Sequence, residues 1–293
     1  MSFSIKHLVV IGTGLIGGSL ALALRKSGSV EQITGVGRSA ENLEEAKRMG
    51  VIDMASHDIA SAVADADMVL VSTPVAACHQ VFESMAETLP EHAIVTDVGS
   101  TKQSVIAAAQ THLSYPHRFV PAHPIAGAEH SGVKAAFASL FEKHVCVMTP
   151  DEDVDADALA QVQQMWESVG AEVMKMSAEQ HDDMLASVSH LPHLAAFALV
   201  NAVRGDDTSG EAFRFAAGGF RDFTRIASSS PEMWRDIALC NREAVMQKID
   251  VLQEELKVLR VALQSEDADG LLQKFADAKQ ARDAWLAKYG EGL

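Results

Sequence analysis

The stretch LVVIGTGLIG at residues 8–17 decides the fold of the first half of this 293-residue chain. Four apolar residues, three of them β-branched, predict a buried strand, which leads directly into a G-x-G-x-x-G turn and a helix-forming segment at residues 19–26. In that order, Gly12 allows a tight turn, Gly14 lets the backbone approach a pyrophosphate, and Gly17 brings the helix against the strand. The N–H groups at the helix N-terminus would then hold the phosphates. The stretch therefore predicts a dinucleotide site, although a glycine turn that only joins two packed elements has a similar local sequence.

Short β-rich segments alternate with helical ones as far as residue 176, which predicts a doubly wound parallel sheet of the Rossmann type. Further strands are predicted at residues 32–36, 68–72, 93–97, 118–120, 145–149 and 171–176, and helices at 42–49, 77–88, 102–110 and 151–169. The β signal vanishes from Ser177 onward. We therefore expect a dinucleotide-binding domain over residues 1–176 and an all-α domain for substrate binding and dimerisation over residues 177–293.

The C-terminal half carries three helical patterns. Residues 183–203 are apolar and rich in Ala, residues 231–264 predict one long helix with a Ser-Pro start, and residues 267–288 predict a last one. Apolar residues in the long helix recur at alternating three- and four-residue steps: Val245, Ile249, Leu252, Leu256, Leu259 and Leu263. Such a stripe either packs inside its own domain or pairs with its copy in a second subunit. We expect the second, a homodimer.

Charge and composition exclude several classes of partner. The net charge of −16 disfavours nucleic acid and anionic membranes, and no uncharged apolar run reaches the roughly 18 residues that span a bilayer. Cys78, Cys146 and Cys240 are odd in number and far apart, which predicts neither a disulfide framework nor a metal site. The expectation is a cytoplasmic protein that binds no nucleic acid, membrane or metal.

The tip of the second predicted strand indicates which nicotinamide cofactor is used. A domain that prefers NAD usually places a carboxylate there, whereas this chain has Gly37-Arg38-Ser39. Arg38 offers a charge for a 2′-phosphate, so we expect NADP to be preferred and NAD to be possible, since Glu41 is close enough in sequence to reach a ribose. The residues expected to contact the cofactor are Gly12, Thr13, Gly14, Leu15, Ile16, Gly17, Arg38, Ser39, Ser72 and Thr73.

Polar clusters elsewhere give the chain a recognisable signature. They are GTGLIGGS at 12–19, DVGS at 97–100, HPIAG at 123–127, SHLPH at 189–193 and GFRDFTRIA at 219–227. Together, and in this order, they resemble the prephenate and arogenate dehydrogenase family of tyrosine biosynthesis. The glycine turn is shared by many dehydrogenases, but the last three motifs in combination are specific. The family's acidic contact after the HPIAG motif corresponds to Glu129 here, with Ala128 where some relatives have Thr.

The resemblance implies oxidative decarboxylation of prephenate or arogenate with NAD(P)⁺ and assigns roles to the matching residues. His123 is the catalytic base, aligned by Ser100, and an unperturbed histidine would titrate near about 6.5. The substrate contacts implied are Ser189, His190, His193 and Arg225, the last as a clamp for the side-chain carboxylate.

Each role has a structural alternative. For His123 the alternative is a hydrogen bond to a backbone carbonyl, and for Ser100 it is the cap of a helix beginning at Thr101. The pair His190 and His193 lacks a third ligand at metal spacing, and the alternative for Arg221 with Asp222 is an ion pair that frames the pocket. For the whole chain, the alternatives are another two-domain NADP oxidoreductase of the β-hydroxyacid dehydrogenase type and a catalytically silent NADP-binding sensor. The first class lacks the combination of HPIAG and GFRDFTR motifs, and a turnover assay separates the sensor from an enzyme.

Overall fold

The computed structural model describes residues 3–127, 130–206 and 210–290 of the chain. By its internal contacts the chain forms two compact units, Met1–Ala244 and Val245–Leu293. The predicted domain boundary between residues 176 and 177 stays a prediction.

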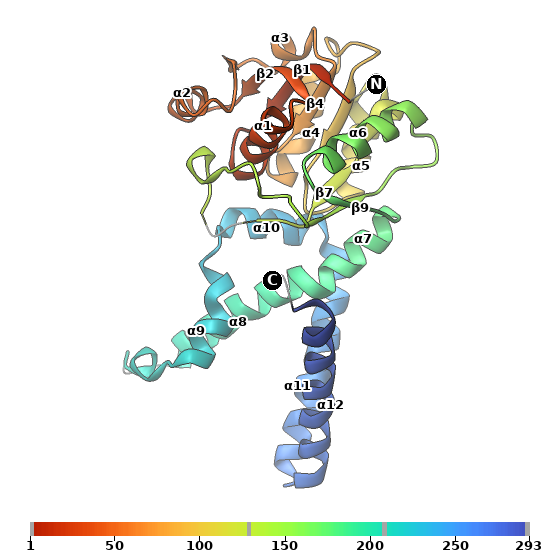
Figure 1. The fold of residues 1–293 in the computed structure, drawn as a ribbon. Helices are drawn as coiled ribbons and strands as arrows, with labels where there is room; N and C mark the ends of the chain where they lie inside the picture. Colours follow the sequence, from red (N-terminus) through yellow and green to blue (C-terminus); the bar gives the residue numbers. More distant parts are fainter. Residues whose placement is uncertain (1–2, 128–129, 207–209, 291–293) are drawn as a thin grey trace. The chain divides into compact units, whose positions relative to one another are not determined.

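A six-stranded parallel sheet forms the first half of the larger unit (Figure 1). Its strands are β1 (Ile5–Ile11), β2 (Val30–Val36), β3 (Met54–Ser56), β4 (Met68–Val71), β5 (Ile94–Asp97) and β6 (Phe119–Val120). The order β3-β2-β1-β4-β5-β6 is that of a dinucleotide-binding sheet, with the direction of winding reversed between β1 and β4. This confirms the predicted doubly wound fold, and it places the ligand crevice at the carboxyl ends of these two strands.

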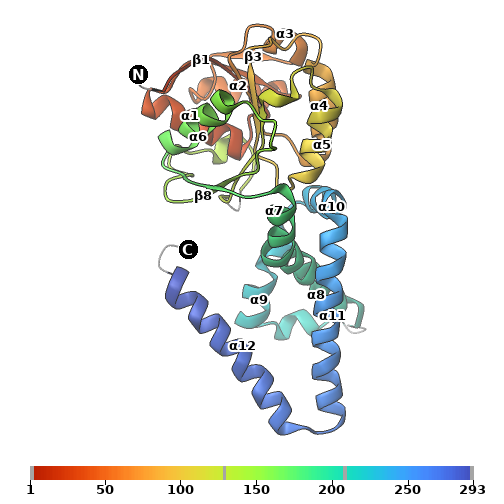
Figure 2. The same cartoon turned by 90° about the vertical axis from the view of Figure 1, so that its right-hand side faces the viewer.

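Helices cover both faces of the sheet because alternate residues of its strands point to opposite sides. Leu8 and Val10 belong to the apolar core that includes α1 (Leu15–Ser27), α2 (Ala40–Arg48) and α6 (Ala156–Ser168). Val9 and Ile11 belong to the core formed with α3 (Ile59–Val63), α4 (Cys78–Met85) and α5 (Gln103–His112). Figure 2 shows α1 and α6 on one side of the sheet and α4 and α5 on the other. The continuous apolar run of β1 is thus explained by burial on both faces.

A second, three-stranded sheet corrects part of the prediction. Strands β7 (Ala122–Pro124), β8 (Val145–Met148) and β9 (Glu172–Lys175) pair in that order, with β7 and β8 antiparallel and His123 opposite Val147. The segments at 145–149 and 171–176 were expected to continue the parallel sheet. Pro121 separates β6 from β7 and has no N–H for a ladder, so the chain leaves the main sheet at this point. The short elements β3, α3 and β7 were not predicted.

Helices follow from Ser177, whose hydroxyl and Gln180 form a capping box at the start of α7 (Ala178–Leu185). A π-helical turn (Ala186–His190) links α7 to α8 (Leu191–Asp206), and Pro192 explains it because a proline cannot donate the regular helical bond. The next two helices are α9 (Gly218–Thr224) and α10 (Pro231–Cys240). Short 3₁₀ turns lie at Val75–Ala77, Pro116–Arg118, Val133–Ala135, Ala212–Phe215 and Arg225–Ser228. The stretch Ala178–Asp206 is long and apolar enough to cross a bilayer by length and composition alone.

The prediction of one helix over residues 231–264 is wrong. The chain forms α10 and then α11 (Arg242–Gln264), with a break at Asn241, whose side chain is used for buried hydrogen bonds instead of lying on a helix surface. A last helix, α12 (Ala268–Tyr289), begins at the cap Asp267. In α11, Val245 is buried, whereas Leu256 and Leu263 are 56% and 66% exposed. The other three residues of the stripe are half-buried, so the stripe is partly uncovered in a single chain.

Candidate active site

The glycine turn after β1 has the geometry that a pyrophosphate requires. Gly12 has a φ of +98°, and a Cβ there would stand 2.3 Å from the carbonyl oxygen of Ser72. A Cβ on Gly17 would stand 2.4 Å from the carbonyl oxygen of Gly12, so only a glycine at this position lets the helix lie this close to the turn. Gly14 is the N-cap of α1 and supplies no side-chain cap, and a Cβ there would meet no described atom within 4 Å. The first N–H groups of α1 are thus left for an anion, which fits a dinucleotide.

Side chains around the turn hold its shape. Asn42 donates to the Thr13 hydroxyl at 2.8 Å and to the Thr13 carbonyl at 3.2 Å. The hydroxyl of Ser39 accepts from the backbone N–H of Asn42 and caps α2, while Arg38 beside it is exposed. Ser72 and Thr73 are half-buried at the end of β4, and Ser72 touches the turn. The structure therefore brings the predicted cofactor residues of β1 and β4 together and places Arg38 at the tip of β2.

A buried ion pair organises the loop after β5. Asp97, the last residue of β5, and Lys102 are both fully buried and paired. Asp97 also accepts from the backbone N–H groups of Gly99 (2.7 Å) and Ala122 (3.1 Å), and Lys102 donates to the carbonyl of Ala122 (2.6 Å). A charge in this position is tolerable only because each group is paired and hydrogen-bonded. The pair therefore fixes β7 against the loop that carries Ser100.

The helix after this loop is capped from a distant part of the chain. Helix α5 begins at Gln103, and the carboxylate of Asp182 in α7 accepts the N–H groups of Lys102 (2.8 Å) and Gln103 (2.9 Å). Ser100 therefore does not cap this helix, which was the structural alternative for that residue. Burial raises the pKa of Asp182, but hydrogen bonds from His181 and from the two amides outweigh it, and the pKa lies below its ordinary value.

His123 lies on β7 next to a second histidine. Its Nδ1 is 2.8 Å from Nε2 of His181, and Nδ1 of His181 is 2.8 Å from Asp182 Oδ1. Burial, followed by the charges of Lys102, His181 and His190, holds the pKa of His123 well below 6.5. The expected titration near 6.5 is thus corrected downward, and His123 is a neutral acceptor at physiological pH. The only hydrogen bond described for its side chain is to His181, not to a backbone carbonyl.

The two histidines of the SHLPH motif gather around an indole. His193 stacks on Trp234 with ring centroids 3.6 Å apart, and its Nδ1 is 2.9 Å from the Ser189 carbonyl. His190 is buried, packs edge-on to Trp234 and lies 3.1 Å from the Asn241 amide. Burial lowers the pKa of His190 to about 4 and also lowers that of His193. Both histidines are therefore neutral near pH 7.

Arg225 and its neighbours lie on the exposed side of this group. Arg225 opens the 3₁₀ turn after α9, and its charge is near enough to contribute to the lowered pKa of His193. Arg221 and Asp222 form the expected ion pair at 3.0 Å, but both side chains are mostly exposed. Ala128 and Glu129 lie outside the described residues.

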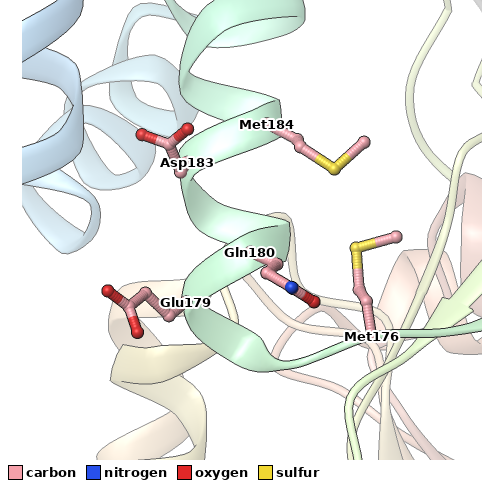
Figure 3. Close-up of a pocket in the computed structure, with 5 residues that line it drawn as sticks. All are labelled: Met176, Glu179, Gln180, Asp183 and Met184. Atoms are coloured by element: carbon pink, nitrogen blue, oxygen red, sulfur yellow. The ribbon is translucent and has the colours of Figure 1, made fainter.

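A shallow pocket lies on another side of α7, lined by Met176, Glu179, Gln180, Asp183 and Met184. Figure 3 shows the two methionine side chains on one side of the helix and the two carboxylates on the other. Its lining includes none of the predicted site residues, so we do not assign the reaction to it.

Four residues of the site were missed from the sequence: His181, Asp182, Trp234 and Asn241. The pair His181-Asp182 lies about two helical turns before the SHLPH motif, and this spacing along one helical stretch was the available signal. Trp234 and Asn241 offered none, because only the fold brings α10 beside α8. Among the described residues, no three His, Cys, Asp or Glu side chains are grouped as metal ligands would be.

Comparisons with known proteins place the chain in a family. Residues 20–175 match the nucleotide-binding domain of prephenate dehydrogenase, and residues 177–277 match its dimerization domain. The chain is 40% identical to a cyclohexadienyl dehydrogenase of Zymomonas mobilis, over 94% of this chain and 95% of that one.

Two solved structures are similar over nearly their whole length. Prephenate dehydrogenase from A. aeolicus, in complex with hydroxyphenyl propionate and NAD⁺, superposes with a TM-score of 0.92 at 38% identity, covering 97% of this chain and 99% of that one. Synechocystis arogenate dehydrogenase gives a TM-score of 0.81 at 29% identity, covering 96% and 100%. Because the two family models together match residues 20–175 and 177–277, and a relative is 40% identical over nearly its whole length, the chain belongs to the prephenate dehydrogenase family.

Proposed function

We propose that this chain catalyses the oxidative decarboxylation of prephenate or arogenate with a nicotinamide cofactor. The products are 4-hydroxyphenylpyruvate or tyrosine, CO₂ and the reduced cofactor, and the reaction belongs to tyrosine biosynthesis. The observation that carries the proposal is the position of His123, which is half-buried on β7, just after the carboxyl end of β6, with its Nδ1 2.8 Å from Nε2 of His181. A proton acceptor is needed there because the substrate hydroxyl must lose its proton as the ring carbon is oxidised.

The chain's own residues divide the work as follows. His123 accepts the hydroxyl proton, and the hydroxyl of Ser100 aligns the substrate and the base. The nicotinamide, when bound at the turn of Gly12, Gly14 and Gly17, accepts a hydride from the ring. Arg225 holds the side-chain carboxylate, for which a planar guanidinium is well suited.

The SHLPH segment forms the wall beside the substrate side chain. His193 donates from Nδ1 to the Ser189 carbonyl, which leaves Nε2 as an acceptor for the substrate. His190 is held by Asn241 and shapes the wall from behind. The indole N–H of Trp234 is buried without a hydrogen-bond partner among the described residues, so it adds a donor that a carboxylate or carbonyl of the substrate can satisfy.

Steady-state turnover with prephenate and arogenate, each with NAD⁺ and NADP⁺, tests the proposal. Reduction of the cofactor with release of CO₂ from either substrate supports it. Failure of all four combinations in a folded protein that binds cofactor would instead support the silent sensor. Oxidation of a β-hydroxyacid with no turnover of either cyclohexadiene would support the other oxidoreductase class.

We further propose that NADP is preferred over NAD. Arg38 is exposed at the tip of β2, and Nδ1 of His57 lies 2.7 Å from the carbonyl of the preceding residue, Gly37. Two groups able to carry positive charge suit a 2′-phosphate. We expect a higher kcat/KM with NADP⁺ than with NAD⁺, and we expect Arg38→Ala to reduce the difference between the two values. An equal or higher kcat/KM with NAD⁺ in the unaltered enzyme contradicts the preference for NADP.

We propose that the chain works as a homodimer in the cytoplasm. The apolar residues exposed on α11 and α12 need a cover, and they include Val251, Leu256, Val258, Val261, Leu263, Leu272 and Phe275. The three cysteines are free, which suits a reducing compartment. Light scattering at micromolar concentration should report twice the chain mass, and a monomer would rule the dimer out.

A further inference from the structure

We propose that Asp182 and His181 are positioning residues that set the proton on the ring of His123 and receive positive charge from it during the reaction. The inference rests on the proposed function for the identity of the base. It goes further by assigning a task to two buried residues of α7, a helix outside the glycine-turn half of the chain.

The carboxylate of Asp182 is surrounded by hydrogen-bond donors. Asp182 Oδ1 accepts from the N–H of Lys102 and faces Nδ1 of His181, while Oδ2 accepts from the N–H and the side-chain amide of Gln103. The three contacts other than His181 are all N–H donors, and the hydrogen bonds hold the pKa of the carboxyl below its ordinary value, so Asp182 is ionised. Nδ1 of His181 must therefore carry a proton and donate it to Asp182.

The position of the proton on His181 in turn determines the position of the proton on His123. In the proposed resting state His181 carries a single ring proton, on Nδ1, so its Nε2 has a lone pair and accepts a hydrogen bond. The atom 2.8 Å away is Nδ1 of His123, which must therefore be the donor. A neutral His123 with its proton on Nδ1 has a lone pair on Nε2, and Nε2 is then the atom that takes the substrate proton.

The opposite arrangement would disable the base. If Nε2 of His181 carried the proton, it would donate to His123 Nδ1, and a neutral His123 would hold its own proton on Nε2. The groups that face this pair are Lys102 and Asp97 from the β5 loop, His190 from the π turn and Asp182. Of these four groups, only Asp182 has a described hydrogen bond to the His181 ring, so it decides between the two arrangements.

The same contacts stabilise the positive charge that forms when the substrate proton is abstracted. As the substrate O–H bond breaks, an N–H bond forms at Nε2 of His123, and the proton on Nδ1 of His123 passes to Nε2 of His181. The cation then lies on His181 against the Asp182 carboxylate. On product release the shifts reverse, and the proton leaves to water from Nε2 of half-buried His123.

The decisive variant is Asp182→Asn. An amide can present its NH₂ group to His181, which reverses both rings; the corresponding change in a Ser-His-Asp triad lowers kcat about 10⁴-fold through the wrong tautomer. We expect kcat to fall by about 10²- to 10⁴-fold with KM within a few-fold. His181→Gln, whose amide oxygen can still accept from His123, should lose less rate than His181→Leu.

Gln103→Ala is the matched control, because Gln103 touches the same carboxylate on the oxygen turned away from His181. It should leave kcat within a few-fold. If Asp182 serves only as the cap of α5, Asp182→Asn will lower the melting temperature while kcat of the folded enzyme stays near normal, and the proposal is overturned. An equal rate for His181→Gln and His181→Leu also overturns it.

A measurement that needs no turnover separates this inference from the proposed function. Long-range ¹H–¹⁵N spectra of protein labelled with [¹⁵N]histidine report which ring nitrogen is protonated, and His123→Asn identifies the His123 signals among the twelve histidines. We expect the proton on Nδ1 in the unaltered protein and on Nε2 in Asp182→Asn. A proton on Nε2 of His123 in the unaltered protein contradicts the inference, whatever the substrate proves to be.

Discussion

The two sides of the site are built in opposite ways. The cofactor side is a run of consecutive residues, in which Gly12, Gly14 and Gly17 shape one turn between β1 and α1. The substrate side is assembled from separate segments, in which Asp182 of α7 binds the start of α5, His181 binds His123 of β7, and Asn241 binds His190. The first side depends on backbone shape, and the second on buried polar groups that all need partners. A change on the first should weaken cofactor binding, whereas a change on the second should affect rate or stability.

The largest effect is expected from His123→Asn. Loss of a positioned base should lower kcat by about 10²- to 10⁴-fold with KM within a few-fold, as measured in steady state. Because the pKa of His123 is lowered, the neutral base persists to more acidic pH, and the acid limb of kcat/KM in the unaltered enzyme should lie below 6.5. The exposed His117→Asn should change neither quantity. A normal kcat with an intact acid limb would make His123 structural.

The next effect is on stability. Lys102→Met leaves the fully buried Asp97 charge without its cation, and breaking a buried pair costs about 3–5 kcal/mol of unfolding free energy. Lys26→Met, which removes an exposed partner of Glu142, should cost about 1 kcal/mol or less. Urea unfolding of both variants measures the difference. Similar losses in the two would show that the buried pair does not hold β7 in place.

The pH dependence of stability follows from His190. Its pKa of about 4 lies below that of an unfolded histidine, so between pH 6.5 and 4 the unfolded chain binds a proton that the folded chain does not. Stability is then full above about 6.5 and falls as the pH drops, by about 3 kcal/mol from this group. Denaturant midpoints at pH 7 and 4.5, with His190→Asn as the comparison, test this. An equal slope in that variant would assign the effect to other groups.

The smallest effect should come from the glycine turn. Gly12→Ala combines a positive φ with a Cβ that would stand 2.3 Å from the Ser72 carbonyl oxygen, and we expect a loss of about 1–3 kcal/mol in stability together with weaker cofactor binding. Gly28→Ala is the control, because Gly28 has a φ of +70° but no described atom within 4 Å of the added carbon. Calorimetry should show unchanged cofactor affinity in Gly28→Ala. Equal affinity in both variants would mean that the turn does not touch the cofactor.

The sequence by itself determined the local parts of this protein. The apolar run of β1, the glycines after it and the Ser-Pro start of α10 act within a few residues, so their conformations can be predicted from nearby residues alone. The motifs also identified His123 and the SHLPH segment, because each is a short run with an unusual composition.

Only the tertiary structure decided how these parts meet. Asp182 caps a helix 80 residues earlier in the chain, and Asn241 interrupts an otherwise helical stretch because its amide bonds the Asp182 carbonyl and His190. The second sheet forms because Pro121 ends pairing with the first. These outcomes depend on which buried polar groups find hydrogen-bond partners across the fold. A buried polar group without a partner lowers stability by about 1–3 kcal/mol. This is enough to override a local helical preference, which is less than about 1 kcal/mol per residue.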